Sequence, residues 1–217
     1  MKLIDLSQPV FDGCPNCPAD PPVQSRLICR PGKDGWRVEQ LTLTSHTGSH
    51  IDAPSHKILG GPHIDELSLE SFTGRAVLAD LRDSRPGQPF TSTWLARKLR
   101  VELAGHIVIL VTGWGAKRAR TEEWLGLSPY VSPDAAEWLV EQEIRGVGID
   151  HYSIGGMREP QNSRTHEILL GAGVWILEDL NAPDELWSLS QPLEFWALPI
   201  NLRGHSGAFC RPVVVVR

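Results

Sequence analysis

Three histidines and an aspartate crowd into one short segment, Ser45-His46-Thr47-Gly48-Ser49-His50-Ile51-Asp52-Ala53-Pro54-Ser55-His56. A helix would suit two histidines four residues apart, but Gly48 and Pro54 disfavour one. We therefore expect an extended segment that bends at Pro54. Alternate side chains of an extended chain share one side, and the residues of matching parity are His46, Gly48, His50, Asp52 and His56.

Imidazole and carboxylate groups at this density are typical of a metal site. His46, His50 and Asp52 lie within seven residues and make an open set of ligands for Zn²⁺ or Mn²⁺. The alternative is a polar loop whose histidines bond each other and water. One histidine alone would favour that loop, but three histidines and an aspartate of shared parity, in a chain with eight histidines, favour the metal site.

A second segment combines a histidine with a carboxylate. His166 falls on a short predicted helix, Thr165–Leu170, which Gly171 ends, and Glu178 follows the apolar run 174–177. A charge is costly beside an apolar strand unless it is paired or bound to a metal. Taken alone, this segment favours a structural role.

Length and composition predict one domain, residues 1–217, with a sizeable core. The net charge of −5, without a block of like charges, argues against a nucleic-acid partner or an anionic membrane surface. The longest apolar run, 107–111, has the length of a buried strand, and residues 1–5 contain no signal-peptide core. We expect a cytoplasmic protein with four reduced cysteines.

Short apolar runs separated by glycine and proline predict an α/β fold with few helices. The expected strands are Lys2–Leu6, Val38–Ser45, Arg75–Leu81, Ile107–Thr112, Gly146–Ile149, Val174–Leu177, Leu193–Leu202 and Pro212–Val216. Besides Thr165–Leu170, the expected helices are Trp94–Leu99, capped by Thr91, and a helix led by Ser132-Pro133-Asp134 that ends near Ile144. The segment 82–93 is the most linker-like part of the chain.

The first segment, HTGSHIDAPSH, resembles the HxGTHxDxPxH signature of the cyclase family of metal-dependent hydrolases, which includes bacterial kynurenine formamidase and isatin hydrolase. The second segment, with His166 and Glu178 twelve residues apart around Leu-Leu-Gly-Ala-Gly, is similar to the other ligand segment of that family. Weaker similarities occur at 148–150 and 207–211. The resemblance covers nearly the whole chain.

The resemblance implies a swivelling β/β/α fold with a mixed sheet, assembled as a homodimer or homotetramer. It implies two divalent ions, Zn²⁺ or Mn²⁺. His46, His50 and Asp52 would hold one ion, and Asp52, His166 and Glu178 the other, with Glu178 also reaching the first. His56 would be the general acid and base.

We therefore expect a hydrolase that uses metal-activated water to cleave a C–N bond of a small amide, either an aryl formamide or a cyclic amide or imide. The alternatives are a kynurenine formamidase proper and, in another class, a metal-binding protein without turnover. Kynurenine formamidases resembling this chain carry a substrate-contacting tryptophan where it has Cys17. That difference makes Cys17 a candidate substrate-binding position and argues against kynurenine as the substrate.

Two further motifs do not predict a functional site. Cys14 and Cys17 form a CxxC motif, but the prolines that follow prevent a helix from starting there, so we expect a turn. A second motif, Gly204-His205-Ser206-Gly207-Ala208, resembles a nucleophile elbow. We expect no catalytic serine there, because the acid and the histidine that should follow the serine in the sequence are absent. His63, His106 and His205 are expected to be ordinary histidines, and the role of His151 stays open.

Overall fold

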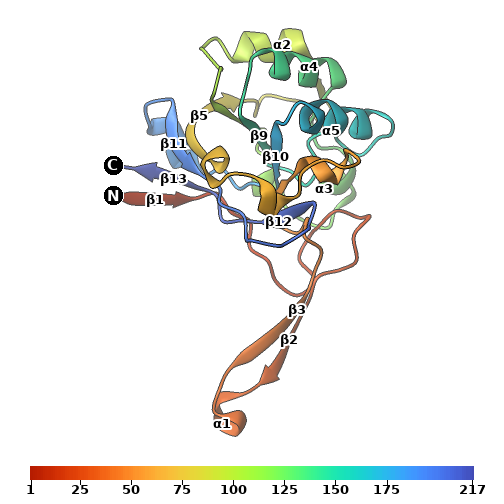
Figure 1. The fold of residues 1–217 in the computed structure, drawn as a ribbon, viewed down its shortest axis with the longest axis vertical. Coiled ribbons are helices and arrows are strands. Elements are labelled where there is room, and N and C mark those ends of the chain that lie inside the picture. Colours follow the sequence, from red (N-terminus) through yellow and green to blue (C-terminus); the bar gives the residue numbers. More distant parts are fainter.

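A nine-stranded mixed sheet runs through the molecule (Figure 1). The computed structural model describes all 217 residues. In sheet order the strands are β1 (Lys2–Asp5), β13 (Val213–Val216), β11 (Leu193–Trp196), β5 (Thr73–Asp80), β7 (Ile107–Val111), β9 (Gly146–Ile149), β10 (Trp175–Glu178), β4 (His50–Asp52) and β12 (Gly207–Phe209).

The four central strands, β5, β7, β9 and β10, are parallel, and every outer pairing is antiparallel. Parallel strands are covered on both faces and are therefore almost continuously apolar. In β7 all five residues are buried. Val108 and Leu110 join the core on one face, whereas Ile107, Ile109 and Val111 join the core on the other.

Three helices cover one face of the sheet: α2 (Ser92–Lys98), α4 (Pro133–Glu141) and α5 (Gln161–Gly171) (Figure 1). Their side chains Leu95, Leu139 and Leu169 belong to the core cluster that Val108 and Leu110 enter from the sheet. A separate core lies on the opposite face and includes Phe72 and Phe195. The expected α/β fold with a mixed sheet and few helices is confirmed.

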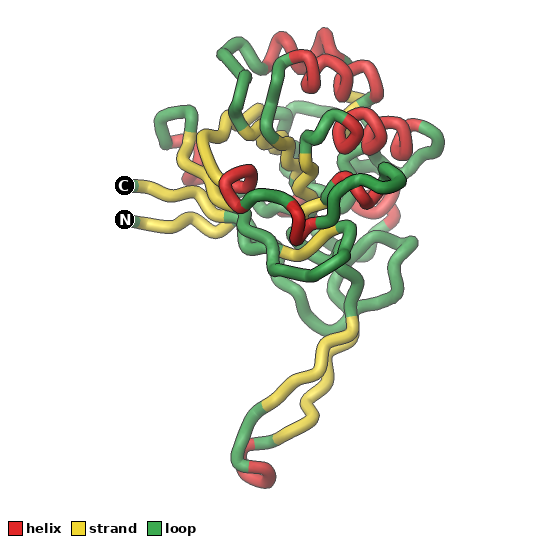
Figure 2. Tube along the Cα trace, viewed as in Figure 1, coloured by secondary structure: helices red, strands yellow, loops and turns green.

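Two small strand pairs lie outside the main sheet. β6 (Pro89–Phe90) pairs with β8 (Tyr130–Val131). β2 (Gln24–Cys29) and β3 (Val38–Thr42) form a hairpin with the single-turn helix α1 (Pro31–Asp34) between them. Figures 1 and 2 show this hairpin projecting from the body of the molecule, on the side opposite α2. The fifth helix, α3 (Glu122–Gly126), lies beside the sheet.

The structure corrects several predicted elements. The segment 46–56 is extended only at His50–Asp52. Before that strand the chain turns at Gly48, whose φ is +63°, and after it Pro54–His56 forms a 3₁₀ turn. The predicted strand from Leu193 ends at Trp196, and the one from Val38 ends at Thr42.

The predicted helices are all present with shifted ends. Thr91 caps α2 by accepting from the backbone N–H of Trp94, as expected. The helix after Ser132 ends at Glu141, earlier than predicted. The helix around His166 begins at Gln161, one turn before the predicted start, because Asn162 and Ser163 continue it. No helix is both long enough and apolar enough to cross a membrane.

Substituting Gly146 by alanine will destabilise the fold, because a Cβ at this position would lie 2.2 Å from the Trp175 ring on the next strand. Overpacking of this kind typically costs about 1–3 kcal/mol of unfolding free energy. Gly126→Ala is the matched control, since no atom lies within 4 Å of its added Cβ, and it should change stability by less than about 1 kcal/mol. Urea unfolding of both variants measures the difference, and equal stabilities would contradict this account of β9.

Candidate metal centre

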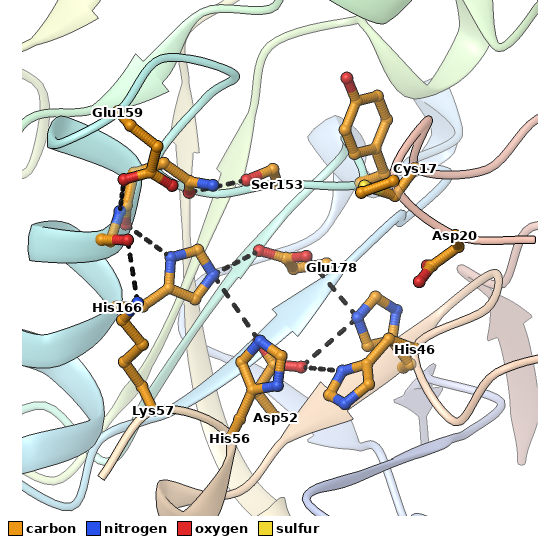
Figure 3. A pocket seen from close by; sticks show the side chains of 15 residues that line it. Cys17, Asp20, His46, Asp52, His56, Lys57, Ser153, Glu159, His166 and Glu178 are labelled. Carbon is orange, nitrogen blue, oxygen red and sulfur yellow. Dashed lines mark hydrogen bonds and ion pairs between the residues drawn. The ribbon is translucent and has the colours of Figure 1, made fainter.

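Two neighbouring strands bring the two sequence segments together. β4 pairs with β10 in an antiparallel register that sets His50 opposite Glu178 and Asp52 opposite Ile176. α5, which precedes β10, contributes His166, and the 3₁₀ turn after β4 contributes His56. Figure 3 shows the side chains of Asp52, His56, His166 and Glu178 converging on one cavity.

Asp52 lies at the centre of the cluster. Its Oδ1 is 2.7 Å from His46 Nδ1 and 3.4 Å from His50 Nε2. Its Oδ2 is 3.8 Å from His166 Nε2. Glu178 spans the same two histidines, with Oε2 3.6 Å from His50 Nε2 and Oε1 3.3 Å from His166 Nε2. All five predicted ligand residues therefore meet in one place.

In His46, His50 and His166, one ring nitrogen faces the carboxylates and the other is fixed by a hydrogen bond. His50 Nδ1 lies 2.8 Å from the carbonyl oxygen of Gly48, and His166 Nδ1 lies 2.9 Å from that of Asn162. His46 Nε2 lies 3.1 Å from the hydroxyl of Ser206. A nitrogen fixed in this way leaves the opposite nitrogen aimed at the carboxylates.

The pKa shifts follow from the proximity of these groups. Burial alone would raise the pKa of Asp52, but His56 and His46 outweigh it and hold this pKa well below its usual range. Burial alone would lower the pKa of His50 and His166, yet the adjacent carboxylates raise both pKa values to about 9. In His56 the loss of hydration prevails and lowers the pKa, although the ring reaches solvent at the cavity mouth.

The cluster fits a divalent cation. Asp52 Oδ2 is buried and accepts no hydrogen bond, which is costly for a carboxylate oxygen unless a cation faces it. Ligand atoms of His50, Asp52 and Glu178 lie within 4.8 Å of one another, and so do those of His46, Asp52 and His56. Both groups share Asp52. Imidazole and carboxylate ligands of this kind suit Zn²⁺ or Mn²⁺.

The cavity beside the cluster has a volume of about 250 Å³. Cys17, the candidate substrate-binding position, lines it, and burial raises the pKa of its thiol. Sequence analysis did not single out the other eight lining residues, which include Asp20, Lys57 and Tyr152. Lys57 directly follows the histidine-rich segment, whereas Asp20 and Tyr152 lie outside both ligand segments, so only the fold brings the three together.

Other residues singled out by sequence have structural roles. His151 is buried outside the cavity lining, with Nε2 2.8 Å from the carbonyl oxygen of Trp124, and burial lowers its pKa to about 3. It is a neutral core histidine. Its neighbour Asp150 accepts hydrogen bonds from the backbone and hydroxyl of Thr112, which ties β9 to the end of β7. Cys14 is buried and unpaired.

The hydroxyl of Ser206 contacts the His46 ring, which the sequence did not predict. The segment around it is not a nucleophile elbow, because Ser206 precedes β12, which pairs with β4. Its carbonyl oxygen accepts from the N–H of Ala53, and this bond holds the hydroxyl beside His46. A side chain at Gly207 would overlap the His46 ring, with a Cβ only 2.6 Å away.

A buried ion pair supports the wall of the cavity from behind. Arg118 Nη2 lies 2.8 Å from Oδ2 of Asp179, the residue after Glu178. The same guanidinium donates to the carbonyl oxygens of Pro9 and Pro15. Burial raises the pKa of Asp179 to about 6 against the opposing effect of Arg118. Arg118 thereby joins the end of β10 to the loop that leads to Cys17.

The chain belongs to the cyclase family: the family model described as "Putative cyclase" matches residues 4–155. The kynurenine formamidase of Salinibacter ruber is 29% identical over 226 aligned positions, covering 99% of this chain and 97% of that protein. The structure of a predicted metal-dependent hydrolase from Bacillus stearothermophilus matches with a TM-score of 0.79 and 29% identity, covering 98% and 97% of the two chains.

Isatin hydrolase A from Ralstonia solanacearum has the same fold, with a TM-score of 0.84 at 23% identity, covering 100% of this chain and 92% of that chain. The resemblance of the histidine-rich segment to the cyclase signature is thus confirmed at the level of the family. Nearly the whole of both chains is matched.

Replacing Arg118 by methionine will leave Asp179 buried beside Glu178 without its guanidinium partner. Breaking a buried pair in this way costs about 3–5 kcal/mol of unfolding free energy. Lys117→Met is the matched control, because Lys117 is exposed and lies 3.7 Å from Glu123 in a solvent-accessible pair, worth at most about 1 kcal/mol. Denaturant unfolding compares the two variants, and a loss below about 1 kcal/mol for Arg118→Met would show that this pair does not support the wall.

Proposed function

We propose that this chain is a metal-dependent hydrolase that cleaves a C–N bond of a small amide, acting on aryl formamides or cyclic amides and imides. The observation that carries the proposal is the position of Asp52, whose two oxygens face different histidines in a buried cluster. A carboxylate in this position suits bridging between two cations. The relatives named as kynurenine formamidase and as metal-dependent hydrolase support the same reaction class.

In this proposal His46, His50 and Asp52 hold one ion, and Asp52, His166 and Glu178 hold a second, with Glu178 also reaching the first. The ions are Zn²⁺ or Mn²⁺, up to two per chain. When bound, such ions polarise a substrate carbonyl and lower the pKa of water toward neutrality. The residues behind the cluster, Gly48, Asn162 and Ser206, hold the three imidazoles in the orientation this requires.

His56 is the general acid and base of the proposed reaction. Its ring lies next to His46 and His166, with centroid distances of 4.2 and 5.9 Å, at the point where the cluster meets the open cavity. The lowered pKa keeps the imidazole neutral near pH 7 and able to accept a proton. It then delivers that proton to the departing amine, which is too poor a leaving group to depart as an anion.

The substrate side of the cavity argues against N-formylkynurenine as the preferred substrate. Cys17 offers little surface for stacking, and it packs instead against the aromatic cluster of Trp114, Trp124 and Tyr152. Tyr152 is the one aromatic side chain that also lines the cavity. We therefore favour an aryl formamide or a cyclic amide over kynurenine formamidase activity proper.

The remaining features of the proposal come from the family resemblance and the composition. The chain acts as a single domain, residues 1–217, on a small molecule, in the cytoplasm, and assembles as a homodimer or homotetramer. A metal-binding protein without turnover is the alternative of another class. It would keep the five ligands but would have no use for a proton-accepting His56 beside an open cavity, so His56 discriminates between the two.

Purified protein is expected to carry divalent metal, up to two ions per chain. His50→Ala should lose most of it, because His50 is buried between Asp52 and Glu178. His106→Ala serves as the control and should keep wild-type metal content, since the His106 ring lies outside the cluster and hydrogen-bonds to the backbone carbonyl of Ala104. Elemental analysis measures both. Wild-type protein that is free of metal and does not respond to added Zn²⁺ or Mn²⁺ would refute the proposed centre.

His56→Ala should keep metal content near that of the wild type and reduce the hydrolytic rate by about 10²–10⁴-fold, the usual contribution of a general acid or base. His106→Ala again provides the control and should turn over at the wild-type rate. Elemental analysis and initial rates on an aryl formamide are measured on the same preparations. Loss of metal in step with activity would make His56 a ligand, while an unchanged rate would favour the metal-binding alternative.

Cys17→Trp should improve the turnover of N-formylkynurenine by up to about tenfold, because aromatic stacking adds about 0.5–1.5 kcal/mol beyond area burial. Cys17→Ser is the control: it keeps the cavity open and should leave kcat/KM for simple aryl formamides, cyclic imides and lactones unchanged. The measurement is kcat/KM across this panel. Wild-type kcat/KM for N-formylkynurenine of about 10⁵ M⁻¹s⁻¹ or more would instead identify a kynurenine formamidase.

A further inference from the structure

Lys57 is the only lysine or arginine among the 15 residues that line the cavity (Figure 3). It directly follows His56, and its backbone N–H donates to the carbonyl oxygen of Pro54 at 3.1 Å, which closes the 3₁₀ turn after β4. One short segment of backbone therefore carries both His56 and this ammonium group. The proposed function gives His56 a role and Lys57 none.

The protein itself uses only part of the bonding capacity of this ammonium. Lys57 Nζ donates to the hydroxyl of Ser163, 2.9 Å away on α5, and Ser163 also lines the cavity. Lys57 forms no ion pair with any carboxylate of the chain. An ammonium has three N–H donors, and a hydroxyl that accepts one hydrogen bond keeps its own proton to donate. Two donors of Lys57 and the hydroxyl of Ser163 are therefore available to a ligand.

Glu159 is an acidic residue near this ammonium, but it bonds to another group. Its Oε2 accepts from the backbone N–H of Ser163 at 3.2 Å. The hydrogen bonding to Ser163 is the main cause of the lowered pKa of Glu159, and the charge of Lys57 is a smaller cause. The two charges are thus near each other without being paired, so Glu159 does not neutralise Lys57 by direct contact.

Lys57 also borders a space that contains no acidic group. Lys57 and His56 both line a second cavity of about 390 Å³, together with Ser55, His63 and the loop 58–61. None of the residues that line this second cavity is acidic. A negatively charged group that contacts Lys57 from this cavity therefore has room, and no carboxylate of the lining repels it.

The charge balance of the metal-loaded site also favours an anion. Four carboxylates line the cavity, those of Asp20, Asp52, Glu159 and Glu178. Two divalent ions carry the same amount of positive charge as these four carboxylates carry negative charge, and histidines that bind metal are neutral. Lys57 then supplies the remaining charge of the lining, +1. A cleft with a charge of one sign attracts ligands of the opposite sign.

We propose that Lys57 selects substrates that carry a carboxylate. The ammonium of Lys57 and the hydroxyl of Ser163 bind the carboxylate, while the amide of the same molecule lies at the metal centre. The substrates are then carboxylated aryl formamides or carboxylated cyclic amides and imides. This inference rests on the proposed function, because it assigns a specificity-determining residue to that site.

Formanilide and its three carboxylated isomers, the formamidobenzoates, test this preference because they differ only in the carboxylate. Wild type should turn over its best isomer with a kcat/KM at least about tenfold above that for formanilide, and Lys57→Met should lower this ratio by about 10–100-fold, the effect of losing a hydrogen bond to a charged group. The loss should appear mainly in KM, since the carboxylate is bound equally in the ground and transition states. Lys57→Arg should keep most of the preference. Lys2→Met is the control and should keep the wild-type ratio, because Lys2 is an exposed lysine on β1, at the opposite edge of the sheet from β12.

Calorimetric titration with the aminobenzoates, the amine products of these substrates, measures binding without turnover. Their Kd should rise by about 10–100-fold in Lys57→Met and stay at the wild-type value in Lys2→Met. A carboxylate held by the metal centre alone would bind wild type and Lys57→Met equally. The proposal is overturned if wild type prefers no isomer over formanilide, or if Lys57→Met keeps the wild-type ratio or the wild-type Kd. If the chain hydrolyses neither formanilide nor any isomer, the proposed function fails, and the Kd values still decide whether Lys57 binds a carboxylate.

Discussion

The pairing of β4 with β10 is the interaction on which the rest of the site depends. β4 is only three residues long, yet it sets His50 against Glu178 and leaves Asp52 facing two histidines. One residue of slip in this register would turn alternate side chains to the other face of the sheet and separate the carboxylates. Further contacts hold the side chains that this register brings together: Ser206 lies behind His46, Asn162 behind His166, and the backbone N–H of Ile154 donates to Glu178.

The charges of the cluster show why it is organised for cations. The two buried carboxylates, Asp52 and Glu178, lie close together and would repel each other. His50 and His166 offset this negative charge, because their pKa values are raised to about 9 and both rings stay protonated near pH 7. A divalent ion can replace those protons, because ligand imidazoles bind in their neutral form. Asp52 keeps one oxygen free of hydrogen bonds for such a partner. The carboxylates that attract these protons would therefore also attract a divalent ion.

Sequence predicted the ligand cluster better than it predicted the cavity. The residues His46, His50, Asp52, His166 and Glu178 stand in two local motifs, and the central strands are continuous apolar runs, so both could be inferred. The extended form predicted for 46–56 was wrong outside β4, because the local turn at Gly48 and the 3₁₀ turn at Pro54 override alternation. The sequence analysis did not predict β2. None of its residues is buried in a core, so its apolar residues follow no pattern that marks a strand. Tyr152, Asp20 and Ser206 have no local pattern, and only long-range pairing places them.

The position of β4 between β10 and β12 has a consequence for local opening. A strand at the edge of a sheet can fray one hydrogen bond at a time, but β4 is bonded on both sides, to β10 and to the Ser206–Phe209 segment. Exposing its amides therefore requires two ladders to part together, along with the core residue Ile51. Backbone protons of β4 should exchange with solvent only in large, cooperative openings. β4, which carries His50 and Asp52, is thus expected to be among the most slowly opening parts of the molecule.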